Sequence, residues 1–482
     1  MNFLSLFVLV PALMMVALAV CRGMRGMRVV MVSGASALLA LAIALVYFYL
    51  SARAGGSTGP MLFADSLTWF APLHICYSVG VDGVSVAMIL LSAVIVFTGV
   101  FASWRTAHQP REFFLWYCLL AMGVFGFFIS VDLFSMFMFY EVALIPMYLL
   151  IGVWGSGRKE YSAMKLTLML MGGSALILMG ILGVYFGAGA ATMNLGELAS
   201  AHIPVEVQRV FFPLTFIGFG VLGALFPFHT WSPDGHASAP TSVSMLHAGV
   251  LMKLGGYGCF RVAIGLMPQA AQEQAGVFLV LTAVGVVYGA LAACVQTDLK
   301  YINAYSSVSH CSLVLFAILM LTTTATTGAV LQMLSHGLMT ALFFALIGMI
   351  YGRTHTRDIR QMSGLMKVMP FLSVCYVVAG LANLGLPGLS GFVAEMTIFV
   401  GAFQVNDGFH RTLTIIATTS IVVTAVYILR LVGRMLYGTV TNKEHLALTD
   451  ATWEERLTLI VLIGAIAGLG LMPWTIIDLI TK

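Results

Sequence analysis

Charged side chains are scarce in this chain of 482 residues, and their scarcity limits the kinds of protein that it can be. Only 9% of the residues are Asp, Glu, Lys or Arg, whereas 60% are hydrophobic and the mean hydropathy is +1.00. Soluble globular domains carry about 25% charged residues, so the composition excludes such a domain. The sequence therefore predicts an integral membrane protein that crosses the bilayer many times.

Cysteine pairs and long polar segments are also missing, and both absences narrow the chemistry. The seven cysteines stand singly, without a pair at the spacing of a zinc, iron–sulfur or disulfide site. We therefore expect no metal and no redox cofactor in this chain. The net charge of +4 is small and the cations lie in short loops, so nucleic acid is not an expected partner. A nucleotide or cofactor would have to bind to other chains, because no long soluble domain is visible.

Long apolar runs are what the sequence has in abundance. A spanning helix needs about 20 mainly apolar residues, and on that criterion the chain holds about fourteen spans. The first run is not a typical cleaved signal, because its basic residues follow it. The fold class is therefore all-α integral membrane. The expected spans are 2–20, 29–51, 79–103, 113–130, 131–155, 163–187, 207–227, 240–266, 275–297, 302–322, 325–352, 369–404, 411–437 and 456–480.

Two of these apolar segments are interrupted by proline and glycine. The stretch GALFPFHTWSPDGHASAP, Gly223 to Pro240, follows the seventh span, and LGLPGLSG, Leu384 to Gly391, divides the twelfth. Helix interruptions at membrane depth are tolerated where they are buried in protein or line a wet cavity. We interpret the first stretch as part of an ion path. An ordinary connection between two helices is the alternative, because proline and glycine are common in membrane helices.

The spacing of the two interruptions predicts an internal repeat. Broken helices near Pro227 and Pro387 are separated by five spans, and paired breaks of this kind indicate inverted repeats with a transport site between them. Two unrelated kinks are the alternative. The expected division is 1–112 for the first three spans, 113–267 for the first five-helix repeat, 268–437 for the second, and 438–482 for the last span.

Cations are divided unevenly between the two sides of the predicted bundle. The richer side faces the cytoplasm by the positive-inside rule, which places both chain termini outside. The cations after odd-numbered spans are Arg22, Arg25, Arg28, Arg105, Arg111, Arg158, Lys159, Lys300, Arg353, Arg357, Arg360, Lys367, Arg430, Arg434, Lys443 and Arg456. Those of the opposite side are Arg53, Arg209, Arg261, Arg411 and Lys482.

Five ionisable residues fall near the middle of five different spans. They are Glu141, Lys253, His310, His336 and Glu395. Each charged group at the bilayer centre costs about 2.5 to 3.5 kcal/mol to insert, so five of them predict a shared polar interior. A proton suits carboxylate, lysine and histidine groups better than a sodium ion, which would need several oxygen ligands. For any one of the five, a structural role in helix packing is an equal alternative.

Three other charged residues have local interpretations. Asp82 and Asp132 lie at helix starts, where we expect them to cap the helix. Lys165 lies one turn into the sixth span, where it either snorkels to the surface or joins the polar interior.

Seven motifs, in order along the chain, carry a family resemblance. They are FYEVALIPMYLLIGVWG, FPFHTWSPDGHASAP, VLMKLGGYG, QTDLKYINAYSSVSH, LSHGLMTALFF, YGRTHTRDI and LPGLSGFVAE. Together they resemble the antiporter-like membrane subunit M of NADH:quinone oxidoreductase, respiratory complex I. The resemblance runs from about Asp82 to beyond Glu395, and it implies fourteen helices with two inverted five-helix repeats.

The resemblance also implies roles and partners. By position, Glu141 is similar to the fifth-helix glutamate, Lys253 to the central lysine, His310 and His336 to the linking histidines, and Glu395 to the exit-side glutamate. The family implies proton translocation in a bacterial inner membrane, driven by NADH, FMN, iron–sulfur clusters and quinone in partner subunits. L-type and N-type antiporter-like neighbours are the expected partners.

Glu395 also helps to separate related families. Sister chains and Mrp-type antiporter subunits usually carry lysine there, which favours subunit M. The absence of a long extension after residue 480 disfavours the L type.

One position departs from the family pattern. The family has a lysine seven residues before the histidine of PFH, which is His229 here, and this lysine pairs with the fifth-helix glutamate. The chain has Leu222 at that position, so Glu141 lacks its expected cation. His247, two turns before Lys253, either replaces the missing lysine or is a packing residue. Lys165, His229 and His247 are therefore further candidates for the proton path.

Three functional interpretations stay open from the sequence. The first is a proton-translocating subunit of a NADH:quinone oxidoreductase, itself without a redox centre. The second is a structural spacer of the membrane arm that conducts few or no protons. The third is a Mrp-type cation/proton antiporter or a membrane hydrogenase subunit.

Overall fold

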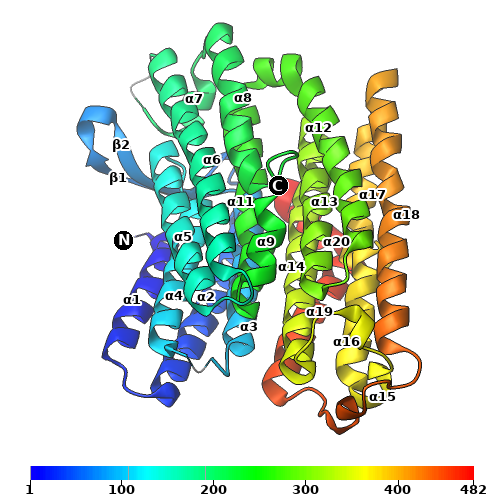
Figure 1. Ribbon diagram of the computed structural model, residues 1–482. Coiled ribbons are helices and arrows are strands. Elements are labelled where there is room, and N and C mark those ends of the chain that lie inside the picture. The colour runs from blue at the N-terminus through cyan, green and yellow to red at the C-terminus, as the bar shows by residue number, and fades with distance from the viewer. Residues whose placement is uncertain (1, 107, 190–191, 482) are drawn as a thin grey trace.

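The computed structural model describes residues 2–106, 108–189 and 192–481, so Lys482, one of the cations assigned to the outer side, lies outside the described residues. The chain forms a bundle of near-parallel helices with one β-hairpin at its upper end (Figure 1). The first elements are η1 (Phe3–Ser5), α1 (Leu6–Val20), α2 (Met24–Ala54), β1 (Leu62–Phe70), η2 (Ala71–Leu73), β2 (Ile75–Val81) and α3 (Gly83–Ala102).

The central part of the chain contains two series of long helices. The first series is α4 (Pro110–Ile129), α5 (Leu133–Trp154), α6 (Lys159–Gly187), α7 (Leu195–Ser200), α8 (Val205–Leu222), α9 (Trp231–Ser238), α10 (Thr241–Leu246), η3 (His247–Leu251), α11 (Met252–Gly258) and η4 (Cys259–Ile264). The second is α12 (Pro268–Val295), α13 (Leu299–Leu319), α14 (Thr323–Thr354), η5 (Ile359–Gln361), α15 (Leu365–Val368), α16 (Pro370–Asn383), α17 (Ser390–Phe403) and α18 (Gly408–Leu436). The chain ends with η6 (Lys443–Ala447), α19 (Trp453–Leu471) and α20 (Pro473–Thr481).

All the predicted spans coincide with helices, and two of them have a form that the sequence analysis did not predict. Residues 241–266 form one helix that contains two π-helical segments, η3 and η4. The last span is not straight, because α19 and α20 meet at an angle of 77°. Pro473 explains this bend, since proline offers no backbone N–H and disfavours the helical conformation of the residue before it.

Eleven of the described helices are long and apolar enough to cross a membrane, and the bent pair α19–α20 makes a twelfth. The helix of residues 241–266 and the pair α16–α17 would bring the total to the predicted number, which stays a prediction. A count by helix length gives fewer than fourteen spans, because α19–α20 is bent and α16 and α17 are each too short to be counted alone.

Both predicted interruptions are present as broken helices. The first separates α8 from α9 at residues 223–230, which include Pro227, and the second separates α16 from α17 at residues 384–389, which include Pro387. Ala224, Gly385 and Gly388 have positive φ angles in these breaks. The first break contains both buried and exposed residues, the second contains half-buried and exposed ones, and Pro227 and Pro387 are themselves exposed.

The predicted caps are also present. Asp82 accepts a hydrogen bond from the Ser85 amide at 2.9 Å and begins α3, and Asp132 does the same for Ser135 and α5. A carboxylate at this position accepts a hydrogen bond from a backbone amide that has no partner within the helix, and its negative charge interacts favourably with the positive end of the helix dipole. Asp82 additionally forms an ion pair with Arg261 of η4, so it joins two elements.

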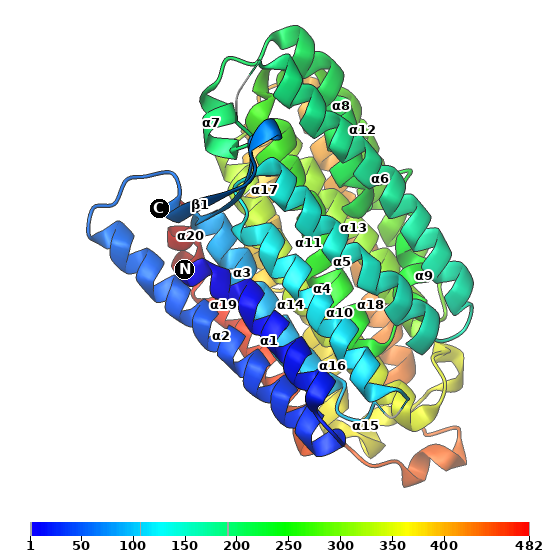
Figure 2. The same cartoon turned by 90° about the vertical axis from the view of Figure 1, so that its left-hand side faces the viewer.

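The helices differ in how far they are enclosed by the rest of the bundle. In both α13 and α14, 94% of the most apolar 18-residue window is buried, compared with 28% in α2 and 33% in α18. The polar residues in the middle of α13 and α14 are thus enclosed by protein. The C-terminal α19 packs against α3 and α14, which brings the last helix back to the first part of the chain (Figure 2).

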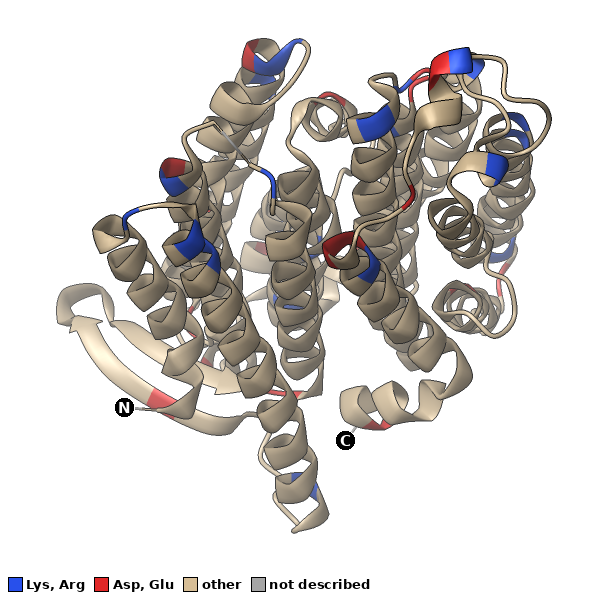
Figure 3. Ribbon diagram, turned by 90° about the horizontal axis from the view of Figure 1, so that it is seen from below, with Lys and Arg blue, Asp and Glu red and all other residues tan. Residues whose placement is uncertain are grey.

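Charged residues gather at the helix ends and in the connections, as the view from below shows (Figure 3). Many of the cations that we assigned to loops lie in the end turns of helices, and Lys300 and Arg261 are two examples. Lys300 is buried in the first turn of α13, where its Nζ donates to the Ala239 carbonyl at 2.6 Å. Arg261 lies in η4 and pairs with Asp82. The orientation of the chain in the membrane stays a prediction.

Candidate functional site

Lys253 lies in the interior of the bundle, where its side chain is only 2% exposed. Its Nζ donates to the carbonyl oxygen of Ala248 at 2.5 Å and lies 2.8 Å from Nδ1 of His336. Ala248 belongs to the π-helical segment η3, and such segments inside α-helices are frequent at functional sites. Among the described residues, no carboxylate forms an ion pair with Lys253. Its hydrogen-bond partners are the carbonyl of Ala248 and the imidazole ring of His336.

His336 of α14 connects Lys253 to a second histidine. The rings of His336 and His310 have centroids 5.2 Å apart, and both side chains are buried. His336 Nε2 has no hydrogen-bond partner among the described residues. Imidazole can accept a proton at one nitrogen and donate from the other, so neighbouring rings on two helices suit proton transfer.

His310 of α13 connects the histidine pair to the broken helix. Its Nε2 lies 2.6 Å from Oδ1 of Asn383, and its Nδ1 lies 2.9 Å from Nε2 of Gln332 and 3.6 Å from Oε1 of Glu395. Glu395 is 8% exposed and lies in the first turns of α17. The ring therefore contacts both halves of the broken helix.

The break itself makes room for the Glu395 carboxylate. Gly385 has φ +65°, and a Cβ at this position would lie 2.9 Å from Oε2 of Glu395. Glycine is therefore required twice here, for the left-handed backbone and for the close approach of the carboxylate.

Asn383 is the polar centre of this part of the site. It ends α16, where Nδ2 donates to Ser306 Oγ at 3.2 Å and to Tyr427 OH at 3.3 Å. Tyr427 OH donates to Ser306 Oγ at 2.8 Å. These contacts hold the amide so that its oxygen faces His310. The result is a chain of polar groups from Lys253 through His336 and His310 to Glu395, which runs across α11, α13, α14 and α17.

Glu141 is placed differently from the other four predicted residues. It lies on α5, which packs between α4 and α6, and it is only half-buried. Its Oε1 is buried without a hydrogen-bond partner among the described residues, although Ser174 lies beside the carboxylate. On the same face of α5, Ile145 and Tyr148 are exposed. The structure thus brings four of the five predicted residues together and leaves Glu141 outside this connected chain.

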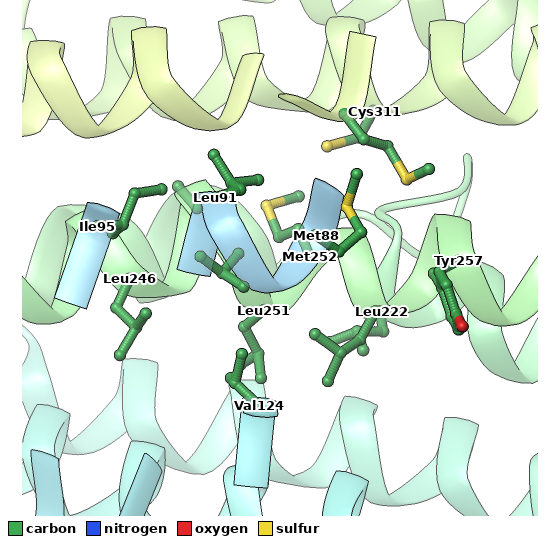
Figure 4. Packing of buried hydrophobic residues seen from close by; sticks show 14 of the residues in the cluster. Met88, Leu91, Ile95, Val124, Leu222, Leu246, Leu251, Met252, Tyr257 and Cys311 are labelled. Carbon is green, nitrogen blue, oxygen red and sulfur yellow. The ribbon is translucent and has the colours of Figure 1, made fainter. Parts of the chain in front are cut away.

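Leu222 fills the position of the missing lysine with an apolar side chain. It is 1% exposed and belongs to an apolar cluster that also contains Leu251 and Val124, whose side chain points from α4 toward Leu251 (Figure 4). The last turn of α8 therefore carries no cation near the membrane centre, as the sequence indicated.

Lys165 is half-buried in an ion pair rather than free to snorkel. Its Nζ lies 2.7 Å from Oδ2 of Asp234 in α9, and Tyr301 OH donates to the other oxygen of this carboxylate at 2.9 Å. The ion pair ties the short half-helix α9 to α6 and α13.

The two other candidate histidines are buried, and each has a ring nitrogen without a hydrogen-bond partner among the described residues. His229 stacks on Phe226 with centroids 5.5 Å apart, and its Nδ1 has no partner among the described residues. His247 packs against His236 at 4.4 Å and Trp231 at 5.4 Å, and neither of its ring nitrogens has a described partner. No hydrogen bond in the described structure links either ring to Lys253.

Sequence reasoning missed Asn383, Gln332, Ser306 and Tyr427, although each lies in the connected chain or supports it. Asn383 stands just before the predicted break, and that position was its signal. Gln332 lies four residues before His336, which places both on one face of a helix. Within the described residues, no cluster of three or more His, Cys, Asp or Glu side chains is placed to hold a metal ion.

Comparison with known proteins places this arrangement in a family. The family described as "NADH:quinone oxidoreductase/Mrp antiporter, TM" matches residues 130–424, which include the four connected residues and both broken helices. The chain belongs to this family. It is 37% identical over 418 residues to NAD(P)H-quinone oxidoreductase chain 4 1 of Synechococcus sp. (strain JA-3-3Ab), with 85% of this chain and 79% of the relative covered.

A second relative and a solved structure agree with this assignment, and a more distant structure shares the fold. The chain is 35% identical over 418 residues to NADH-quinone oxidoreductase subunit M of Rickettsia bellii, with 86% of this chain and 84% of the relative covered. It is similar to a chain of respiratory complex I from Thermus thermophilus with a TM-score of 0.90 at 26% identity, covering 99% of this chain and 98% of that one. A chain of the Mrp complex from Dietzia sp. has the same fold, with a TM-score of 0.81 at 20% identity, covering 99% of both chains.

Proposed function

We propose that this chain is a proton-translocating membrane subunit of a NADH:quinone oxidoreductase, and that protons pass along Lys253, His336, His310 and Glu395. The observation that carries this proposal is the connected polar chain, in which all four side chains are buried and the two histidines lie on the highly enclosed helices α13 and α14. A lysine that can exchange its proton with a neutral histidine, and a histidine beside a carboxylate, provide the transfer steps. The relatives named subunit M and chain 4 support the assignment.

The energy for transport would come from partner chains. In this proposal NADH, FMN, iron–sulfur clusters and quinone bind to other subunits, and this chain takes part in the enzyme as its translocating component. L-type and N-type antiporter-like subunits would flank it in the membrane arm, and both termini would face the outside of a bacterial inner membrane.

The proposed division into two inverted five-helix repeats is supported by similar packing. In one series α4 packs on α5, α5 on α6, and α6 on the broken pair α8–α9. In the other, α12 packs on α13, α13 on α14, and α14 on the broken pair α16–α17. The units would be 113–267 and 268–437, preceded by 1–112 and followed by 438–482.

The other interpretations have less support. A spacer without transport would not need four titratable groups in contact at buried positions, each of which is costly in a membrane. The Mrp complex is a similar fold at 20% identity, which is an argument about fold alone.

Proton yield in the whole complex tests the proposal. The complex is reconstituted in vesicles, and the protons moved per electron are measured for wild type, Lys253→Ala and the control Lys367→Ala, which removes an exposed lysine of α15. We expect Lys253→Ala to lower the yield and Lys367→Ala to leave it unchanged. An unchanged yield together with unchanged quinone reduction in Lys253→Ala would overturn the proposal.

A further inference from the structure

A cavity of about 590 Å³ opens at the end of the bundle where α13 ends and α14 begins. This is the end opposite the loops that hold most of the cations, and therefore the predicted outer side. Threonine hydroxyls and one ion pair make its wall polar: Thr322, Thr323, Thr326 and Thr327 line it, as does Asp82, which pairs with Arg261. Hydroxyl groups donate and accept hydrogen bonds, so this wall suits water.

The inner wall of the cavity is apolar and points toward Lys253. Phe260 of η4, Ile318 of α13 and Val330 of α14 form this wall. One turn deeper on the same three helices, Gly256, Val314 and Met333 line a second cavity, which also contains Lys253. The three helices therefore share one seam, which runs from the outer cavity to the lysine.

The seam between the outer cavity and Lys253 is closed by apolar side chains. Val314 and Met333 are buried, and the second cavity has a volume of only about 10 Å³, which is barely room for one water molecule. A Cβ on Gly256 would lie 3.1 Å from Met333 Sδ and 3.1 Å from Val314 Cγ1, so the missing side chain is what leaves this space. Apolar constrictions of this kind gate channels by excluding water.

The geometry points to an outward half-route that leads from Lys253 through this seam to the outer cavity, with Gly256, Val314 and Met333 as its gate. This inference rests on the proposed function, and it gives the central lysine a second exit in addition to the branch through His336 and Glu395. The Met333 thioether is unbranched and flexible, so its rotation can open the gate without moving a helix. In the closed gate, a proton on Lys253 can pass only to His336.

A native cysteine reports on the gate independently of proton transport. Cys311 lines the small cavity on the inner side of the gate, and it is a free thiol. The whole complex in sealed vesicles is treated from the outer side with a charged, membrane-impermeant thiosulfonate, and modification of Cys311 is followed by mass spectrometry. The variants are Met333→Ala, which shortens the gate, and Met339→Ala, which removes an equally buried methionine of α14 outside the seam. Cys118, buried elsewhere, is the internal control.

We expect Cys311 to react about tenfold faster in Met333→Ala, a change of about 1.4 kcal/mol in the barrier, and at the wild-type rate in Met339→Ala. Equal rates in the two variants would overturn the inference. Because labelling needs no turnover, this result is separate from the fate of the proposed function, which depends on Lys253→Ala.

A complementary variant narrows the gate. Gly256→Ala adds a methyl group inside the seam, whereas Gly172→Ala adds one on α6 where no atom lies within 4 Å. We expect Gly256→Ala to lower the protons moved per electron at least twofold and Gly172→Ala to have no effect. The inference fails if Gly256→Ala keeps the wild-type yield while Lys253→Ala loses it, and this test stands even if Met333→Ala does not assemble.

Discussion

The two broken helices of this chain interrupt the bundle in similar ways, but their surroundings differ in chemistry. At the second break, Asn383 and Glu395 contact His310, and the contacts continue through His336 to Lys253. At the first break, the last turn of α8 presents Leu222, and the indole of Trp231 donates to the Val221 carbonyl at 3.0 Å. One break is therefore part of a polar chain, and the other is closed by apolar packing.

The comparison distinguishes the features that a broken helix needs in order to fold from the side chains that proton transfer needs. Both breaks need proline, glycine or an unusual backbone, and both must satisfy the backbone groups that the missing helical turns leave free. Titratable side chains contact one another near both breaks, but only those of the second break continue through contacts to Lys253. At the first break the chain has Leu222, where the family pattern implies a lysine that pairs with Glu141.

The largest difference between the two halves should appear when the glutamate of each half is replaced by glutamine. Glu395→Gln removes the carboxylate beside His310, and positioned proton-transfer groups contribute about 10²- to 10⁴-fold, so we expect a large loss of protons per electron. Glu141→Gln should change the yield little, because no described hydrogen bond joins Glu141 to the chain. Equal losses in the two variants would show that the halves work as one route. Proton uptake by vesicles that contain the complex is the measurement.

Leu222→Lys should introduce a titratable group at the first break, and it should lower the stability of the complex. A buried lysine at mid-membrane costs about 2.5 to 3.5 kcal/mol, less whatever it gains by pairing with Glu141. We expect Leu222→Lys to lower the thermal midpoint of the complex, and Leu222→Lys with Glu141→Gln to lower it further. Leu222→Met is the control for packing, since volume-conserving changes cost little. Identical midpoints with and without Glu141 would show that the two positions do not interact.

Asn383→Leu should weaken the second half more mildly. The amide holds His310 by one hydrogen bond of 2.6 Å, and a hydrogen bond contributes about 0.5 to 1.5 kcal/mol, so we expect up to about a tenfold slower proton transfer. A positioning role predicts that the pH profile of proton translocation changes along with the rate. A slower rate with an unchanged profile would assign Asn383 to packing alone. Asn383→Asp, which keeps the oxygen, should restore part of the activity.

The smallest effect is expected from His247→Phe. Neither ring nitrogen has a described partner, so a phenyl ring should keep the packing against Trp231 and His236 without leaving a polar atom unpaired. We expect the proton yield to change less than about twofold and the thermal midpoint to stay or rise. A loss comparable to that of Lys253→Ala would instead assign His247 to the proton path. His336→Phe is the matched change in the connected half, and it should abolish transfer.

Much of this architecture could be predicted from the chain alone, because its physical causes are local. Apolar runs of about 20 residues indicated the spans, and the prolines at 227 and 387 indicated the breaks. The cost of ionisable groups in a membrane singled out five residues, of which Lys253, His310, His336 and Glu395 form the connected chain and Glu141 does not.

Features of the fold and the site that the sequence did not predict depend on contacts between segments that are distant along the chain. The Asn383 amide matters because the end of α16 meets α13, and the ion pair of Lys165 with Asp234 joins residues 69 positions apart. The hairpin of β1 and β2 was not predicted, because neither LFADSLTWF nor ICYSVGV alternates polar and apolar residues in the way that indicates a strand. The π-helical segments leave no pattern that a single sequence reveals.

One of those segments, η3, has a mechanical consequence. It winds the chain more loosely than the α-helical turns before it, and Lys253 follows directly after it. If η3 tightened to α-helical winding, the residues that follow it in the helix would rotate about the helix axis. The lysine would turn away from His336, and Gly256, one turn later, would swing away from Met333 in the same movement. A change in winding of five residues would thus disconnect one branch and reshape the other at the same time.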